Sequence, residues 1–175
     1  MIKLKDILLE AKSPDIFIPR RMEDRVERLI KNYIRNGNNG DLDLSNMKLT
    51  ELPEILKNVD IKGDFFCSTN KLTSLEGSPK TVGGDFYCSN NKLTSLEGSS
   101  KTVGGDFFCC DNNLTSLVGS PSSVGMNFVC RNNNLTSLVG APSSVGGNFF
   151  CRNNPIKFTE MQVRAVCDVK GEVYV

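Results

Sequence analysis

The stretch GDFFCSTNKLTSLEGSPKTVG, residues 63–83, decides the fold because it recurs every 21 residues along the chain. Further copies read GDFYCSNNKLTSLEGSSKTVG (84–104), GDFFCCDNNLTSLVGSPSSVG (105–125) and MNFVCRNNNLTSLVGAPSSVG (126–146), and a truncated copy, GNFFCRNNPIKF, follows them. A looser copy, two residues longer, starts at Gly40. A fixed period of this length is typical of a solenoid, in which each unit buries its apolar side only by stacking on its neighbours.

The composition narrows the classes of function. A chain of 175 residues, of which 39% are hydrophobic, is long enough for one domain with a core of its own. Its net charge of +1 provides no general attraction for nucleic acid or membranes, and no apolar run is long enough for a membrane span. There is no histidine, which is the commonest general base and metal ligand. We therefore expect a protein without catalytic residues, cofactor or metal.

Five of the seven cysteines occupy the same place in successive copies, and Leu44 occupies it in the first copy. A position that accepts Leu or Cys is a core position. A straight line of side chains about 4.8 Å apart cannot form a tetrahedral zinc site, and parallel side chains are poorly oriented for disulfides. The sequence thus predicts a reduced ladder of Cys67, Cys88, Cys109, Cys130 and Cys151 in a reducing compartment. Cys110 is predicted on the opposite, exposed side.

Each copy combines a short alternating segment with a following Asn and Leu. In the copy of residues 84–104 these places are Phe86, Cys88, Asn91 and Leu93. The pattern resembles the leucine-rich repeat, L-x-x-L-x-L-x-x-N-x-L, over residues 40–158. The resemblance implies an α/β solenoid whose parallel β-sheet is built from about six 21-residue repeats. The inward-turning asparagines are expected to bond backbone groups of adjacent turns; they are Asn70, Asn91, Asn112, Asn133 and Asn154.

Residues 12–39 are predicted to form an N-terminal helical cap over the first repeat. A helix is expected over residues 21–36, with Pro19 just before it and Gly37 just after it. The apolar stripe of this helix consists of Met22, Val26, Leu29, Ile30 and Tyr33. The alternative is a helix that binds a partner.

Residues 159–175 are predicted to form a C-terminal cap. The segment TEMQVRAVCDV is expected to be a short helix, and EVYV to be a strand that pairs with the last repeat. The apolar side of this segment is predicted to be Met161, Val163, Val166 and Val169.

The first eleven residues contain a second resemblance. Leu8, Leu9, Glu10 and Ala11 resemble the site that the prohead protease of T4-like bacteriophages cleaves after Glu. The segment IFIPRR and the repeats are also similar to leucine-rich repeat proteins that such phages encode, whose function is unassigned. The resemblance implies that residues 1–11 are a capsid-targeting leader, with Glu10 and Ala11 at the cleavage site. The alternative is an ordinary N-terminal helix.

The residues that alternate with the buried positions face outward, on the side expected to be concave. They include an apolar row of Phe66, Tyr87, Phe108, Val129 and Phe150. Beside this row lie Asp64, Asp85 and Asp106 toward the N-terminus and Arg131 and Arg152 toward the C-terminus. Exposed aromatic patches with polar rims are typical of interaction sites, so these residues are predicted to bind a partner. The alternative is that the row only stabilises the sheet.

These features predict a non-enzymatic protein-binding module. The aspartates disfavour nucleic acid, so the expected partner is a host or phage protein. The phage resemblance implies a protein of the host bacterial cytoplasm that is also packaged in the virion interior and delivered to act on a host or defence protein. The alternative is a structural or adhesin component of the virion. Cys167 has no histidine to activate it, which disfavours catalysis.

Overall fold

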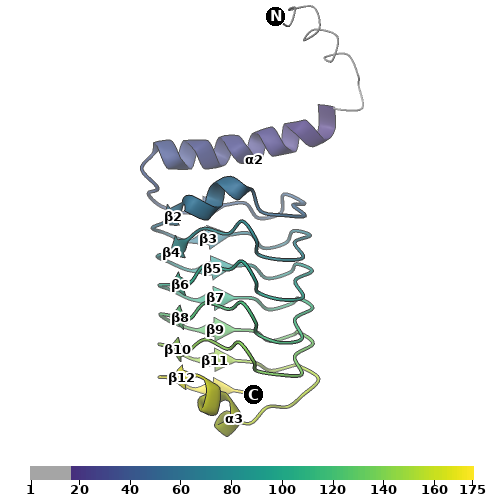
Figure 1. Cartoon of the computed structure of the whole chain (residues 1–175), viewed down its shortest axis with the longest axis vertical. Helices are drawn as coiled ribbons and strands as arrows, with labels where there is room; N and C mark the ends of the chain where they lie inside the picture. The colour runs from purple at the N-terminus through teal and green to yellow at the C-terminus, as the bar shows by residue number, and fades with distance from the viewer. Residues whose placement is uncertain (1–16) are drawn as a thin grey trace, which may run out of the picture.

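The computed structural model describes residues 17–175, with side chains from Arg25 onward. Within this range the chain is a parallel β-solenoid of about six turns with a repeat of about 21 residues, and a helix lies at each end (Figure 1). The predicted leader and its cleavage site at Glu10 and Ala11 lie outside the described residues.

Every complete turn contributes a two-residue strand to each of two parallel sheets. The first sheet contains β1 (Leu42–Asp43), β3 (Phe65–Phe66), β5 (Phe86–Tyr87), β7 (Phe107–Phe108), β9 (Phe128–Val129), β11 (Phe149–Phe150) and β13 (Val173–Tyr174). The second sheet contains β2 (Asp60–Ile61), β4 (Thr81–Val82), β6 (Thr102–Val103), β8 (Ser123–Val124), β10 (Ser144–Val145) and β12 (Asp168–Val169). The repeat pattern predicted only the first sheet, because a single buried Val per turn leaves no alternation to recognise.

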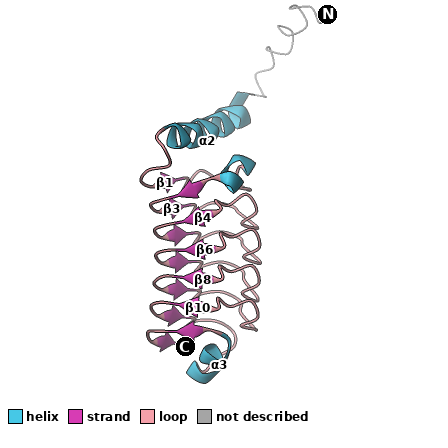
Figure 2. Cartoon of the chain, turned by 60° about the vertical axis from the view of Figure 1, so that its left-hand side comes forward, coloured by secondary structure: helices cyan, strands magenta, loops and turns pink. Residues whose placement is uncertain are grey.

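The strands of both sheets pair in register, so equivalent residues of successive turns lie next to one another. Phe65 pairs with Phe86, and Phe86 pairs with Phe107. Figures 1 and 2 show the turns one below another in a nearly straight column. Because the column is nearly straight, the surface that was expected to be concave is called the first-sheet face. It comprises the outward-pointing residues of the first sheet and the residues that flank its strands.

The core is a set of columns that run through all turns. The largest side chains in it are five fully buried phenylalanines whose neighbouring ring centroids lie 5.1–5.5 Å apart. They are Phe65, Phe86, Phe107, Phe128 and Phe149. The predicted cysteine ladder lies in the same core, and all of its thiols are free. Burial of each phenylalanine contributes roughly 1.5–3 kcal/mol, which makes this column a main source of stability.

The predicted asparagine ladder is confirmed. The Nδ2 atom of Asn91 donates to the carbonyl oxygens of Cys67 and Cys88, both at 3.1 Å, and its Oδ1 atom accepts the backbone N–H of Leu72 at 3.0 Å. Asn112 and Asn133 repeat these contacts in buried positions. Each amide thus ties its own turn to the turn before it and satisfies backbone groups that burial would otherwise leave unpaired.

Two kinds of glycine permit the close stacking. A Cβ atom on Gly104 would lie 2.1 Å from the carbonyl oxygen of Gly83 in the previous turn, although the backbone of Gly104 is not left-handed. Gly98 instead has a φ of +85°, at the turn that follows the Leu96 position. The Gly-Gly pairs therefore serve close approach between turns, whereas the single glycine serves both a left-handed turn and close approach, since a Cβ on Gly98 would lie 2.3 Å from the backbone nitrogen of Glu76.

The N-terminal helix, α2 (Phe17–Arg35), lies across the first turn (Figure 1). Val26, Ile30 and Tyr33 are buried in the common core, which confirms a cap. The helix begins four residues before the expected start, because Pro19 falls in its first turn, where a missing N–H costs nothing. The two-residue insertion of the first repeat forms a short 3-10 helix, η2 (Glu54–Asn58).

The C-terminal helix, α3 (Glu160–Val166), begins with a capping box between Thr159 and Gln162. The prediction that Met161 and Val166 face the core was wrong, because their side chains are 82% and 49% exposed. Val163 and Val169 are buried as predicted, and Cys167, four residues after Val163, is buried with them. The EVYV strand is confirmed as β13.

The C-terminal edge of the second sheet is closed by a single side chain. The guanidinium of Arg164 donates to the carbonyl oxygens of Val169 at 2.6 Å and Gly171 at 2.8 Å. The Nε–H group of Arg164 also donates to Oε1 of Glu160 at 2.7 Å. Arg164 thereby occupies acceptors that an added strand would otherwise use.

Candidate functional site

The strand register gathers the predicted partner-binding residues into three parallel columns on the first-sheet face. The acidic column precedes the strands, the middle column is the second residue of each strand, and the third column lies two residues further on. The middle column contains Asp43, Phe66, Tyr87, Phe108, Val129, Phe150 and Tyr174. Tyr174 was missed by the sequence analysis, although the alignment of EVYV with the repeat strands gives its place.

The aromatic side chains of the middle column stack face to face. The rings of Phe66 and Tyr87 are 4.6 Å apart and inclined by 5°, and those of Tyr87 and Phe108 are 4.7 Å apart and inclined by 6°. Phe150 and Tyr174 form a second stack at 4.5 Å. Stacking leaves these rings half-buried, so the face presents their edges rather than the open row that was expected. Val129, also expected to be exposed, is buried between the two stacks at 7% exposure.

The acidic column is part of the scaffold. Asp64 accepts the backbone N–H of Asp85 through Oδ1 at 2.8 Å, and Asp85 accepts that of Asp106 at 2.7 Å. Asn127 and Asn148 take the same place in the lower turns. Their amide oxygens accept the N–H groups of the next turn at 2.8 and 2.7 Å. One oxygen per residue therefore performs a structural task, whether the side chain is charged or neutral.

The negative charges of this column are not balanced by ion pairs within the described residues. Asp64, Asp85 and Asp106 lie in register about 4.8 Å apart, and like charges side by side in a sheet are destabilising. Within the part of the chain that the structure describes, none of the three forms an ion pair. Asn127 makes the same hydrogen bond without charge, so the ladder does not require a carboxylate at these positions.

Tyr87 is held in place by the acidic column. Its hydroxyl donates to Oδ2 of Asp85 at 2.8 Å. Burial, and then this bond and the charges of Asp85, Asp64 and Asp106, raise the pKa of Tyr87 to about 12. The phenol is therefore a neutral donor at physiological pH.

The third column changes from hydroxyl to guanidinium groups down the solenoid. Ser89 and Cys110 lie side by side with Oγ and Sγ 3.0 Å apart, and Ser89 also donates to the carbonyl of Phe108 at 3.2 Å. The prediction that Cys110 is exposed was wrong: it is 7% exposed, because in-register stacking sets Ser89 against its thiol. Arg131 and Arg152 are exposed in the lower turns, and Arg152 lies 5.2 Å from the ring centre of Tyr174.

A basic column beyond the third column was missed by the sequence analysis. Lys48, Lys71 and Lys92 are exposed and directly follow the ladder asparagine position of their turns. Their backbones stack in register, since Lys71 donates to the carbonyl of Leu49 and Lys92 to that of Leu72. The same place holds Asn113 and Asn134 in lower turns. The recurrence of lysine after the ladder position in the repeats is the signal that predicts this column.

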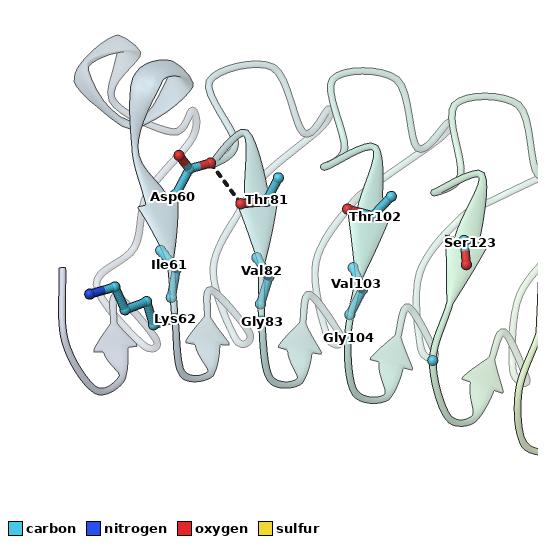
Figure 3. Close-up of a pocket in the computed structure, with 11 residues that line it drawn as sticks. Asp60, Ile61, Lys62, Thr81, Val82, Gly83, Thr102, Val103, Gly104 and Ser123 are labelled. Carbon is cyan, nitrogen blue, oxygen red and sulfur yellow. Dashed lines mark hydrogen bonds between the residues drawn. The ribbon is translucent and has the colours of Figure 1, made fainter.

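A shallow hollow of about 600 Å³ lies over the second sheet (Figure 3). Thr81, Thr102 and Ser123 line it together with exposed glycines, and Thr81 donates to Asp60 at 2.7 Å. Of the lining residues, only Asp60 and Lys62 are charged, both at one end of the hollow, and the aliphatic side chains of Ile61, Val82 and Val103 are buried. The first-sheet face therefore has the richer chemistry for recognition.

The thiols are poorly suited to nucleophilic chemistry. Burial raises the pKa of every ladder cysteine, and burial together with Asp168 raises the pKa of Cys167 to about 11. These groups are therefore protonated near neutral pH, whereas the thiolate is the reactive form. Among residues 17–175, no three His, Cys, Asp or Glu side chains converge as a metal site would require. No helix in this range is both long and apolar enough to cross a membrane.

Comparison with known proteins gave no match, either to a family model or to a curated protein sequence. The function is therefore inferred from the geometry of the first-sheet face.

Proposed function

We propose that this protein is a non-enzymatic protein-binding module whose binding surface is the first-sheet face. The observation that carries the proposal is the unneeded charge of Asp64, Asp85 and Asp106. Asparagine makes the same ladder hydrogen bonds in the lower turns, and of the three aspartates Asp85 alone also accepts a bond from Tyr87, so most of this negative charge costs electrostatic energy without serving the fold. A partner with complementary groups accounts for them.

The remaining chemistry of the face suits a protein partner. Aromatic edges supply apolar contact in the middle column, and Arg131 and Arg152 supply donors at the far end. The ladders hold these side chains in place before binding, which lowers the entropic cost of association. A nucleic acid would bring phosphates against the aspartates and is disfavoured.

The proposed biological context rests on the resemblance of residues 8–11 to a prohead cleavage site. A phage protein made in the host cytoplasm, packaged and delivered with the genome would act on a host or defence protein. Intact-mass measurement of purified particles tests this context. A species that begins at Ala11 supports a processed, delivered protein, whereas abundant full-length chain supports a structural or adhesin role.

A capture experiment with matched variants tests the binding surface. Immobilised wild-type chain is compared with Asp85→Asn/Asp106→Asn in lysates of the host, with quantitative mass spectrometry of retained proteins. The variant keeps both ladder bonds and loses only the bond from Tyr87 to Oδ2 of Asp85, so its unfolding midpoint should fall little while capture of the specific partner falls at least tenfold. Glu97→Gln, which neutralises an exposed carboxylate away from the face, should capture normally. Equal capture by the wild type and the double variant would refute the proposal.

A further inference from the structure

The aspartates of the acidic column and the lysines of the basic column lie at the same end of the solenoid. The acidic column holds aspartate in the first four turns, at Asp41, Asp64, Asp85 and Asp106, and asparagine in the next two. The basic column holds lysine in the first three turns, at Lys48, Lys71 and Lys92, and asparagine in the next two. Both columns repeat with the strand spacing of about 4.8 Å. Opposite charges therefore flank the aromatic stack in the same turns and with the same period.

No ion pair within the described residues joins the two columns. Asp64 and Lys71 of one turn are separated by the strand and the corner that contains Asn70, with six residues of chain between them. The attraction between the columns is therefore available to another molecule. A partner must offer charges at the same spacing, which an extended peptide along the column does not, since its same-side residues repeat every 6.6–6.8 Å or so.

We infer that the first-sheet face binds a second copy of this chain in a parallel, two-fold symmetric dimer. The two-fold axis lies in the plane of the face and runs parallel to the solenoid. Each turn of one copy then lies at the same height as the equivalent turn of the other copy, and the left and right edges of the two faces are opposed. The acidic column of one copy then comes opposite the small third-column residues Ser68, Ser89 and Cys110 of the other, beyond which the long side chains of the basic column reach toward the carboxylates, twice in each dimer. The aromatic stacks meet at the axis, in the middle of the interface. The self-complementary surface is what an isologous contact requires.

The charge pattern selects this axis over the perpendicular one. Rotation about an axis across the solenoid would set the upper turns of one copy against the lower turns of the other. Asp64 and Asp85 would then come opposite Asn127, Asn148 or Glu172, and the lysines opposite Asn113 or Asn134. Neither column would find an opposite charge. In the parallel arrangement Arg131 and Arg152 come opposite amides of their own level, so like charges do not meet.

The size of the face sets the expected strength. Six strand spacings and five residues give a surface about 29 Å by about 16 Å, or roughly 450–500 Å² per copy. A total near 1,000 Å² is at the lower limit for specific interfaces. The dimer should therefore be weak and in rapid exchange. Exposed ion pairs are screened by salt, so it should weaken further as ionic strength rises.

Sedimentation velocity of the full chain over a hundredfold concentration range tests the inference, at about 20 mM and about 300 mM salt. The wild type should show concentration-dependent dimerisation that is weaker at the higher salt. Lys71→Glu/Lys92→Glu places acid against acid at both contacts and should raise the dissociation constant at least tenfold. Lys80→Glu/Lys101→Glu changes the net charge equally on exposed lysines outside the basic column and should dimerise like the wild type.

A mixing experiment provides the second readout. Asp64→Asn/Asp85→Asn/Asp106→Asn keeps the ladder bonds but lacks the acidic charges, so it should also dimerise poorly alone. Mixed with Lys71→Glu/Lys92→Glu, it restores one attractive contact of the two, and heterodimers should exceed both homodimers. A wild type that is monomeric at every concentration overturns the inference, as does equal loss of dimer in the Lys80→Glu/Lys101→Glu control.

The inference rests on the proposed function, since both use the first-sheet face, but the two fail separately. If the wild type is monomeric but captures a heterologous partner that Asp85→Asn/Asp106→Asn no longer captures, the dimer inference is wrong and the proposed binding surface stands. A dimer that survives both the lysine and the aspartate variants overturns the inference, because association would then use another surface.

Discussion

The upper turns, through residue 104, and the lower turns, from residue 126, share one backbone and differ in charge. Phenylalanine, cysteine and the inward asparagine are the same in both regions, except in the first copy, where Leu42, Leu44 and Met47 replace them. The acidic column changes from Asp85 to Asn127 and the basic column from Lys92 to Asn134. An inward amide and an outward oxygen acceptor therefore recur in both regions, whereas the aspartates and lysines of the two columns are found only toward the N-terminal end.

The largest effect should come from breaking what the two regions share. Asn91→Ala in the upper turns and Asn133→Ala in the lower turns should each lower the free energy of unfolding by about 3 kcal/mol or more, because each leaves several backbone groups without a partner. Chemical denaturation measures both values. The exposed Asn113→Ala variant is the control and should change little. A cost below about 1 kcal/mol at either site would show that the ladder is dispensable there.

The two glycines of a pair should differ in cost. Gly104→Ala places Cβ against the backbone oxygen of Gly83 and should destabilise by about 2–4 kcal/mol. Gly105→Met should cost much less, because the equivalent position of the next copy is Met126, whose side chain is 54% exposed. Thermal unfolding of the two variants decides the matter. Equal loss in both would mean that Met126 depends on features peculiar to the lower turns.

A strained residue in the upper turns offers a gain in stability. Thr69 has a φ of 57°, a left-handed conformation that is unfavourable for a β-branched side chain. The equivalent residues Asn90 and Asn132 have the same conformation. Thr69→Asn should therefore raise the free energy of unfolding by about 1 kcal/mol. Thr73→Asn, at an exposed position without positive φ, is the control, and a Thr69→Asn variant less stable than the wild type would contradict the account.

The smallest effect concerns the pH dependence that the acidic column gives to Tyr87. The folded chain raises the pKa of Tyr87 from its ordinary 10.0 to about 12, so the folded state holds this proton more tightly than the unfolded state. The resulting stabilisation is complete below pH 10 and is lost as the pH rises through 12. Melting temperatures of the wild type and Tyr87→Phe should therefore converge over this window. A constant difference across it would show that Tyr87 ionises normally.

The solenoid fold was predictable from the sequence because each structural position recurs in successive copies of the repeat. The inward position of Phe86, Cys88 and Asn91 follows from their recurrence in successive copies. The second sheet was missed because two-residue strands such as Thr102–Val103 show no periodicity of their own. Met161 and Val166 were misplaced because apolar character does not fix the phase of a seven-residue helix.

The candidate site was predicted by position but not by role. The register brought Asp64, Phe66 and their equivalents onto one face, as the alternation predicted. The second role of Asp85, as acceptor for the backbone of the next turn, depends on a contact between residues 21 positions apart. The burial of Val129 and Cys110 likewise depends on neighbours in adjacent turns. Such contacts are invisible to a pattern that is read one strand at a time.

The closed edge at Arg164 has a consequence for assembly. A repeat that stacks on an identical repeat has no intrinsic length, so an uncapped array could add units, or whole chains, indefinitely into a fibre. By binding the carbonyl oxygens of Val169 and Gly171, Arg164 blocks the addition of a further turn to the second sheet at one end. At the other end α2 covers the first turn. The number of turns is thus set within the chain, and a 21-residue repeat can be inserted or deleted between the two caps without changing either of them.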